Sequence, residues 1–253
     1  MTVIKPYSNS QKGKKEQVAE MFNHIAPKYD FLNHFLSFGI DKVWRRRAIR
    51  LLMSNSPSKI LDVATGTGDF AIESLKAGAK EVVGIDISEE MLTIGRSKVA
   101  SLGLAHQIVL QKGDSEELGF LDDSFDAVSV AFGVRNFENL SQGIDEIFRV
   151  LKPGGIVCIL EFSKPRYFPV RQIYRLYSFH ILPLLGRLVS KDKSAYKYLP
   201  ESVEGFPDGS DFLNILIKSG FYQSKQYRQT FGVATIYTAL KKLEGTRGQS
   251  VVR

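Results

Sequence analysis

The feature that most constrains this fold is a pair of glycines directly after an apolar, β-prone run. The run 60–64 leads through Thr65 into Gly66 and Gly68, and a helix-compatible segment, 70–76, follows. Glycine lets the backbone pass close to a ligand because no Cβ stands in the way. The free N–H groups of the turn and of the new helix then face that ligand. The pattern predicts strand, tight turn and helix, which is the nucleoside-binding start of an α/β domain.

An acidic residue closes the second predicted strand. The apolar run 82–85 ends in Asp86, about 20 residues after the glycines, where a carboxylate can bind both hydroxyls of a ribose. The glycine turn also fits the G-x-G-x-x-G/A fingerprint of dinucleotide sites, which has many false matches. The turn alone therefore leaves NAD, S-adenosylmethionine and a purely structural turn open.

Polar residues also follow the third and fourth predicted strands. Asp114 and Ser115 come directly after the third strand, where they suit the exocyclic amine of an adenine. A loop or cap role is the alternative for Asp114. Arg135 and Asn136 follow the fourth strand, 127–132, and α/β sheets bind ligands at the carboxyl ends of their strands. These positions are candidates for binding and catalysis.

The order of the predicted elements discriminates between fold families. Five strand–helix units come first, and right-handed crossovers make their strands parallel. A helix over 141–151 is expected to stop at the Pro-Gly sequence 152–155 before strand 156–162. A hairpin of 221–230 and 233–240 then makes the last strand antiparallel. This doubly wound, mostly parallel seven-stranded α/β sheet is the class I S-adenosylmethionine-dependent methyltransferase fold, and no second βαβ half for a nicotinamide follows.

The remaining chain divides by composition around this core. We predict one domain, 1–253. Its parts are a helical N-terminal lid (1–55), a cofactor-binding core (56–163), a basic aromatic cap insert (164–205) and a terminal helix with hairpin (206–242). The lid starts with a polar arm, 1–15, followed by apolar residues at helical spacing up to Pro27. The insert suits a cap over an apolar substrate or a membrane contact. Ordinary packing with a solvated face is its alternative.

Charge and cysteine content restrict the partners. The formal charge of +7, from 34 basic and 27 acidic residues, is compatible with an anionic membrane surface or nucleic acid and establishes neither. Cys158 is the single cysteine, so we expect no disulfide and no metal site. No signal peptide and no run of roughly 18–20 apolar residues is found. We expect a cytoplasmic protein, with peripheral contact to the inner face of the membrane and a homodimer both left open.

Motifs between about residues 18 and 240 resemble the ubiquinone/menaquinone biosynthesis C-methyltransferase family. Several of them are more specific than the glycine turn. The matching segments are 21–30 (MFNHIAPKYD), 32–33 (LN), 36–39 (LSFG), 44–46 (WRR), 62–69 (DVATGTGD), 113–116 (GDSE), 132–136 (FGVRN), 149–155 (RVLKPGG), 160–165 (LEFSKP) and 198–202 (YLPES). The departures are mild: Thr65 stands where relatives often carry Gly or Cys, and Ser115 where many carry Ala.

The resemblance implies a C-methyltransferase that uses S-adenosylmethionine to convert demethylmenaquinol to menaquinol in the last step of menaquinone biosynthesis. Its substrate would be a polyprenylated naphthoquinol, whose tail suits an apolar cap fringed with basic residues. Asp69 would accept from the α-ammonium group of the cofactor, with helix capping as the alternative. The other implied cofactor contacts are Thr67, Asp86, Asp114 and Ser115, with Gly66 and Gly68 allowing close approach.

The implied chemistry needs an activated ring carbon. Such a carbon is a poor nucleophile until the neighbouring hydroxyl is deprotonated or strongly polarised. Arg135 and Asn136 are the candidates for stabilising the developing phenolate. Tyr29, Glu161 and His180 are candidates for a base or a water-positioning partner, each with a structural role as its alternative. The protein must also align the reacting atoms and exclude water.

Other functions share this fold. A methyltransferase acting on a benzoquinol, sterol or phospholipid is one alternative, and a membrane-peripheral protein that binds the cofactor without turnover is another. A nicotinamide dehydrogenase is the third. We expect no nucleic-acid partner, because base-amine methylation commonly uses an Asn/Asp-Pro-Pro-aromatic turn where this chain has 132–136 (FGVRN), and Cys158 lies inside a strand.

Overall fold

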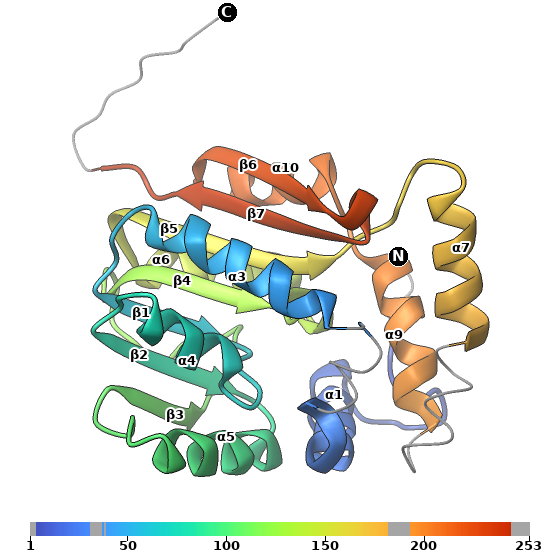
Figure 1. The fold of residues 1–253 in the computed structure, drawn as a ribbon, viewed down its shortest axis with the longest axis horizontal. Coiled ribbons are helices and arrows are strands. Elements are labelled where there is room, and N and C mark those ends of the chain that lie inside the picture. Colours follow the sequence, from blue (N-terminus) through green and yellow to red (C-terminus); the bar gives the residue numbers. More distant parts are fainter. Residues whose placement is uncertain (1–3, 31–36, 38, 182–192, 244–253) are drawn as a thin grey trace, which may run out of the picture.

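The sheet is the frame on which the molecule is built. The computed structural model describes residues 4–30, 37, 39–181 and 193–243. Seven strands form one sheet in the order β3-β2-β1-β4-β5-β7-β6 (Figure 1). Their bounds are β1 Lys59–Val63, β2 Glu81–Asp86, β3 Ile108–Lys112, β4 Phe125–Ala131, β5 Leu151–Phe162, β6 Tyr222–Gln229 and β7 Ala234–Leu240.

Strand direction confirms the predicted topology. The pairs from β3 across to β5 are parallel, whereas β7 is antiparallel to both β5 and β6. The chain moves outward from β1 in one direction through β2 and β3, and in the other through β4 and β5. Ligands of such sheets bind outside the carboxyl ends of the strands at this reversal point.

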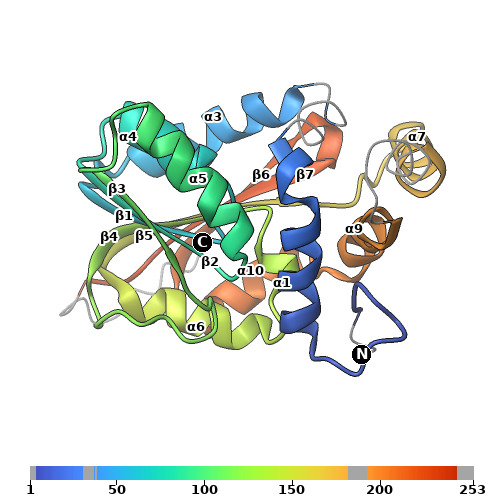
Figure 2. The ribbon, with the colours of Figure 1, turned by 90° about the horizontal axis from the view of Figure 1, so that it is seen from below.

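Helices cover both faces of the sheet. The helices α3 (Ile40–Met53), α4 (Asp69–Lys76) and α5 (Glu89–Ser101) cover one face, and α6 (Leu140–Val150) and α10 (Ser210–Lys218) cover the other (Figure 2). Apolar residues at helical spacing drive this packing. In α6, for example, residues 144, 147 and 150 are fully buried. Each face therefore has its own apolar core.

A third group of elements lies beyond the carboxyl ends of the parallel strands (Figure 1). It consists of α1 (Lys14–Ile25) with the 3₁₀ turn η1 (Ala26–Lys28), α7 (Val170–Leu176) with the π-helical turn η3 (Tyr177–Ile181), and α9 (Lys193–Gly205). Val18 and Met21 of α1 pack against Ala195 and Tyr198 of α9. The α-helix ends just before the predicted break at Pro27, because proline cannot continue the hydrogen-bond pattern.

Of the predicted boundaries that differ from the structure, two concern the N-terminal arm and the start of β5. The polar arm is shorter than expected, because Lys14 already belongs to α1. The sequence 152–155 does not separate α6 from a strand, since β5 begins at Leu151 directly after the helix. Pairing of β4 with β5 jumps from Phe125↔Leu151 to Ala127↔Ile156, so the Pro-Gly residues form an irregularity inside the strand. Among the described helices, none is long and apolar enough to cross a bilayer.

Candidate active site

The glycine turn is fixed by a buried carboxylate. Asp62 of β1 accepts from the Thr65 hydroxyl at 2.6 Å and from the Ser129 hydroxyl of β4 at 2.7 Å. Burial raises the pKa of Asp62 to about 6, because an enclosed site disfavours the charged form of a carboxyl group. Gly66 and Gly68 have φ angles of +57° and +79°, a region that favours glycine. The turn is thus held in one conformation between two strands.

Asp86 lies at the end of β2 and faces the turn. One carboxylate oxygen accepts from the Gly66 amide at 2.8 Å and the other from the Ser88 amide at 2.9 Å. Burial raises the pKa of Asp86. Each oxygen keeps a further lone pair for a ligand hydroxyl. Asp86 therefore has the position and the acceptors that a ribose requires.

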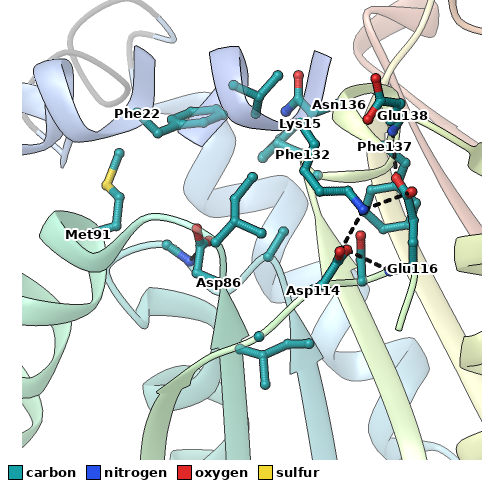
Figure 3. Close-up of a pocket in the computed structure, with 18 of the residues that line it drawn as sticks. Lys15, Phe22, Asp86, Met91, Asp114, Glu116, Phe132, Asn136, Phe137 and Glu138 are labelled. Atoms are coloured by element: carbon teal, nitrogen blue, oxygen red, sulfur yellow. Dashed lines mark hydrogen bonds and ion pairs between the residues drawn. The ribbon is translucent and has the colours of Figure 1, made fainter. Parts of the chain in front are cut away.

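A small cavity surrounds this carboxylate (Figure 3). The predicted residues Gly66, Asp86, Asp114 and Ser115 all line it, as does Asn136. Met91 and Phe22 add apolar walls. Its volume of about 60 Å³ is less than the roughly 150 Å³ that encloses one benzene. An adenosine needs more room than this cavity offers, and we infer that α1, which supplies Lys15 and Phe22 to the wall, moves when it enters.

Two lysines fasten the start of α1 over this cavity. The Lys15 ammonium lies between the carboxylates of Asp114, at 2.5 Å, and Glu116, at 3.2 Å (Figure 3). The Lys14 ammonium donates to the carbonyl oxygens of Phe137 at 2.7 Å and Arg135 at 3.0 Å. Desolvation lowers the pKa of Lys14 to about 8. Sequence reasoning missed Lys15, since nothing in the polar N-terminal segment distinguishes this lysine from its neighbours.

Thr67 and Asp69 point into a charge network instead of the cavity. The Thr67 hydroxyl donates to Asp30 at 2.6 Å. The Lys98 ammonium contacts Asp30 at 2.7 Å and Asp69 at 2.6 Å, and Arg45 donates to Asp69 at 3.0 Å. Neither Thr67 nor Asp69 is among the residues that line the small cavity. Their predicted contact with a cofactor stays a prediction.

A second cavity of about 450 Å³ adjoins the first. Its walls are mostly apolar and come from α1, α3, α7, η3 and α9, with contributions from the ends of β4, β5 and the terminal hairpin. The two cavities share Phe22, Tyr29 and Phe132. The rings of Phe22 and Tyr29 meet edge to face at 5.9 Å. An aromatic wall therefore separates the small polar cavity from a larger apolar chamber.

Arg135 lines the large cavity, and its side chain is only 8% exposed. Its Nη1 donates to Glu161 Oε1 at 2.8 Å and to the carbonyl of Phe132. Glu161 is fully buried, and burial raises its pKa. The Nε–H of Arg135 is buried and has no hydrogen-bond partner among the described residues. Such an orphaned donor is costly unless a ligand satisfies it.

Asn136 follows Arg135 in the sequence, but its side chain lies at the other cavity. It lines the small cavity, whereas Arg135 lines the large one. Its Oδ1 accepts from the Tyr198 hydroxyl of α9 at 3.1 Å, and Tyr198 lines the large cavity. Asn136 therefore connects the two cavities. His180 is exposed and lines neither of them.

Comparisons with known proteins agree with this geometry. The family model of the ubiE/COQ5 methyltransferase family matches residues 10–241. The chain is 50% identical to the demethylmenaquinone methyltransferase of Bacteroides fragilis, over 94% of this chain and 97% of the relative. It is 47% identical to the ubiquinone/menaquinone biosynthesis C-methyltransferase UbiE of Geotalea daltonii, over 90% and 97%. A crystal structure of a SAM-dependent methyltransferase from Thermotoga maritima shares the fold, with a TM-score of 0.64, 19% identity and coverage of 88% and 99%.

The polar groups around the small cavity suit S-adenosylmethionine, the cofactor of these methyltransferases. Asp86 offers two acceptors for the ribose hydroxyls, and Asp114 with Ser115 offers polar atoms for the adenine edge. Gly66 has no Cβ, and one built there would point toward the Tyr29 ring. These hydrogen-bonding groups are thus the ones that a nucleoside needs.

We expect Asp86→Asn to weaken S-adenosylmethionine binding about tenfold to a hundredfold. The amide side chain cannot accept from both ribose hydroxyls, and a hydrogen bond to a charged group contributes about 1.5–3 kcal/mol. Isothermal titration calorimetry measures the Kd. Asp126→Asn is the matched control, because Asp126 also accepts from two backbone amides, Ser58 and Lys59, at the opposite end of β1. Equal losses in both variants would contradict the assignment.

We expect Lys15→Ala to speed S-adenosylmethionine binding about two- to fivefold. The variant removes the ion pairs that hold α1 closed, and partly exposed pairs contribute about 0.2–1 kcal/mol. Stopped-flow mixing measures the association and dissociation rates, and both should rise. Lys12→Ala is the control, because Lys12 pairs with Glu20 of α1 itself at 2.7 Å. An unchanged association rate would show that these pairs do not limit opening.

Proposed function

Because the chain belongs to the ubiE/COQ5 methyltransferase family, we propose that it converts demethylmenaquinol to menaquinol, the last step of menaquinone biosynthesis. The observation that carries the proposal is the pair of adjoining cavities that share Phe22, Tyr29 and Phe132. One has the acceptors for a nucleoside cofactor, and the other is large and apolar. Relatives named demethylmenaquinone methyltransferase support the choice of acceptor.

The large cavity suits a polyprenylated naphthoquinol. Its volume of about 450 Å³ lies in the range of sites that bind small organic molecules. Phe162 and Trp44 give it an aromatic wall in which the two rings meet edge to face, with centroids 6.3 Å apart. Fused rings pack well against such walls. Apolar residues of α7 and α9 continue the lining toward the outside, where the prenyl tail would lie.

The reaction asks the protein to stabilise a developing phenolate. S-adenosylmethionine supplies, when bound, an electrophilic methyl group on its sulfonium sulfur. We assign the unused Nε–H of Arg135 to the substrate oxygen beside the reacting carbon. Glu161 and the Phe132 carbonyl hold the guanidinium in place, so little reorganisation is needed as charge develops. Tyr29, on the shared wall, excludes water between the two ligands.

Asn136 has a positioning role in this proposal. Its side chain lies on the cofactor side and is held by the Tyr198 hydroxyl. Burial raises the pKa of Tyr198 far above neutral pH, so this hydroxyl stays protonated and keeps donating. Asn136 thereby fixes the distance between the two cavities and does not contact the phenolate itself.

The test is methyl transfer from labelled S-adenosylmethionine to demethylmenaquinol kept under reducing conditions. We expect labelled menaquinol from the reduced acceptor and none from the quinone, because only the quinol ring carbon is nucleophilic. Arg135→Ala should lower kcat about a hundredfold to a thousandfold, the usual loss for one oxyanion donor. Its Kd for S-adenosylmethionine should not change, since Arg135 lies on the other cavity.

Controls separate the alternatives. Arg50→Ala removes an exposed arginine of α3 and should leave kcat unchanged. A benzoquinol, a sterol and a phospholipid are assayed as parallel acceptors. Transfer to a sterol or phospholipid without transfer to the naphthoquinol would overturn the proposed substrate. Cofactor binding without transfer to any acceptor would support a binding protein without turnover.

We also propose that the protein is cytoplasmic and that α7 contacts the anionic inner face of the membrane. This helix has no buried residue and lies at the outer edge of the molecule (Figure 1). Phe168, Ile173 and Leu176 are 80%, 63% and 57% exposed. Residues 164–181 include one lysine, three arginines and no acidic residue. Exposed apolar side chains fringed by basic ones suit an anionic bilayer surface.

We expect Leu176→Asp to reduce vesicle binding about tenfold, because the variant replaces an apolar side chain that enters the interface with a charge of the same sign as the lipid. Co-sedimentation with vesicles of phosphatidylcholine and phosphatidylglycerol, 70:30, measures the bound fraction. Leu121→Asp is the control, since Leu121 is 83% exposed in a loop of the core. Equal vesicle binding by the wild type and Leu176→Asp would refute the proposal that this face of α7 contacts the membrane.

A further inference from the structure

The turn that joins the last two strands holds an aromatic residue in an unfavourable backbone conformation. In the turn η4 (Thr230–Gly232), Thr230 and Phe231 have φ angles of +42° and +56°. The left-handed region is costly for a bulky residue. Phe231 is nevertheless 78% exposed, so burial of its ring against the described residues does not offset this strain. Backbone strain of this kind collects at functional surfaces.

The helix α3 holds this turn in place. The indole Nε1 of Trp44 donates to the Thr230 hydroxyl at 2.8 Å. Arg47 Nη1, one helical turn further along α3, donates to Gln229 Oε1 at 3.2 Å. The strained turn and the outer side of α3 are therefore parts of one continuous surface.

The exposed side chains of α3 are basic and apolar. They recur at intervals of three and four residues, so they lie on one side of the helix. None of the exposed residues that the structure describes in α3 is acidic. Val43 is 62% exposed among the basic side chains. We define the α3–η4 face as Lys42, Val43, Arg46, Arg47, Arg50 and Phe231.

The α3–η4 face borders the opening of the large cavity. Residues that line a cavity and are also exposed to solvent mark the place where it opens. Ile40 and Thr230 are such residues on one side, and Ile173 of α7 is such a residue on the other. Figure 2 shows α3 and α7 along the same side of the molecule. The chamber therefore opens between the α3–η4 face and α7.

The chemistry of this face favours a lipid surface over a protein partner. Its two apolar side chains stand among four positive charges, whereas the core of a protein interface is a fully buried patch depleted of charged residues. In an anionic bilayer the apolar side chains enter the headgroup region and the basic ones meet the negative surface. The α7 helix, across the opening, combines exposed apolar and basic side chains in the same way.

We propose that the α3–η4 face binds the anionic bilayer together with α7, and that the prenylated substrate enters the chamber directly from the lipid. Phe231 inserts into the headgroup region, and the basic residues of α3 bind lipid phosphates. Contacts on both sides of the opening fix the orientation of the protein, which α7 alone does not. The inference rests on the proposed function for the lipid nature of the substrate.

The strain in η4 makes one substitution especially informative. Asparagine tolerates the left-handed region better than phenylalanine, so Phe231→Asn should keep or raise the Tm. The same variant should lower binding to vesicles of phosphatidylcholine and phosphatidylglycerol, 70:30, about tenfold. Thermal unfolding and co-sedimentation measure the two quantities. Unchanged vesicle binding by Phe231→Asn would overturn the proposal.

A matched control lies on the opposite face of the sheet. Ile217 of α10 is 55% exposed, and α10 covers the face that α3 does not (Figure 2). Ile217→Asn should therefore bind vesicles as the wild type does. Equal losses in Ile217→Asn and Phe231→Asn would show that exposed apolar side chains act without regard to position, and would also overturn the proposal.

The electrostatic part of the proposal is tested separately. Arg46→Gln removes one exposed charge of the face and should lower binding to the anionic vesicles about fivefold. It should not change binding to vesicles of pure phosphatidylcholine. Lys218→Gln removes an exposed charge from α10 and should have no effect on either. Equal losses in the two variants would show that net charge, not this face, attracts the bilayer.

Two acceptors separate this inference from the proposed reaction. One is a water-soluble demethylmenaquinol with a single prenyl unit, and the other is a long-chain demethylmenaquinol embedded in the anionic vesicles. Phe231 is not among the residues that line the large cavity. Phe231→Asn should therefore keep kcat/KM for the soluble acceptor and lose about tenfold for the embedded one.

The outcomes of this assay are distinct. No transfer by the wild type to either acceptor would overturn the proposed reaction, and vesicle binding would still test the α3–η4 face. Wild-type rates of Phe231→Asn with both acceptors would overturn substrate entry from the lipid. Light scattering covers the remaining occupant: if Phe231→Asn dissociates a dimer and keeps vesicle binding, the face binds a second copy of the chain and the lipid proposal is wrong.

Discussion

The structure depends on the buried carboxylate of Asp62. Its two hydroxyl partners, Thr65 in the glycine turn and Ser129 in β4, tie the reversal point of the sheet together. Removing a carboxylate from water is costly, and only complete hydrogen bonding offsets that cost. In return the turn is rigid, so the Gly66 amide stays directed at Asp86. The glycine turn and Asp86 are thereby in place before any ligand arrives.

The helix α1 couples the two ligands. Its first turn holds the loop after β3 and the turn η2 (Val134–Asn136) through Lys15 and Lys14. Its later turns supply Phe22 to both cavities and Met21 to the large one. Movement of α1 for the cofactor therefore changes the walls of the substrate chamber as well. Binding at one cavity is linked to binding at the other through this one element.

The sequence predicted the frame of this protein better than the directions of its side chains. Strand patterns, the glycine turn and the hairpin were sufficient for the sheet, and Asp86, Asp114 and Ser115 do line the small cavity. Thr67 and Asp69 belong to the same motif but turn toward Asp30 and Lys98, because a motif fixes the backbone path and not every rotamer. Arg135 and Asn136 are adjacent yet serve different cavities, since the 3₁₀ turn η2 splays their side chains. Lys15 reaches the site from the predicted lid, and its contacts with Asp114 and Glu116 depend on tertiary packing.

The terminal hairpin has a consequence for the order in which the protein becomes competent during synthesis. Trp44 donates to the Thr230 hydroxyl at 2.8 Å, within the turn η4 (Thr230–Gly232), and Thr230 and Val233 help to close the large cavity. Every residue that lines the small cavity lies before residue 139. A chain still emerging from the ribosome would thus contain every residue of its nucleoside pocket about a hundred residues before the last residues of the chamber that shields the transferred group from water. The last strands to be translated decide when the reactive centre becomes sealed.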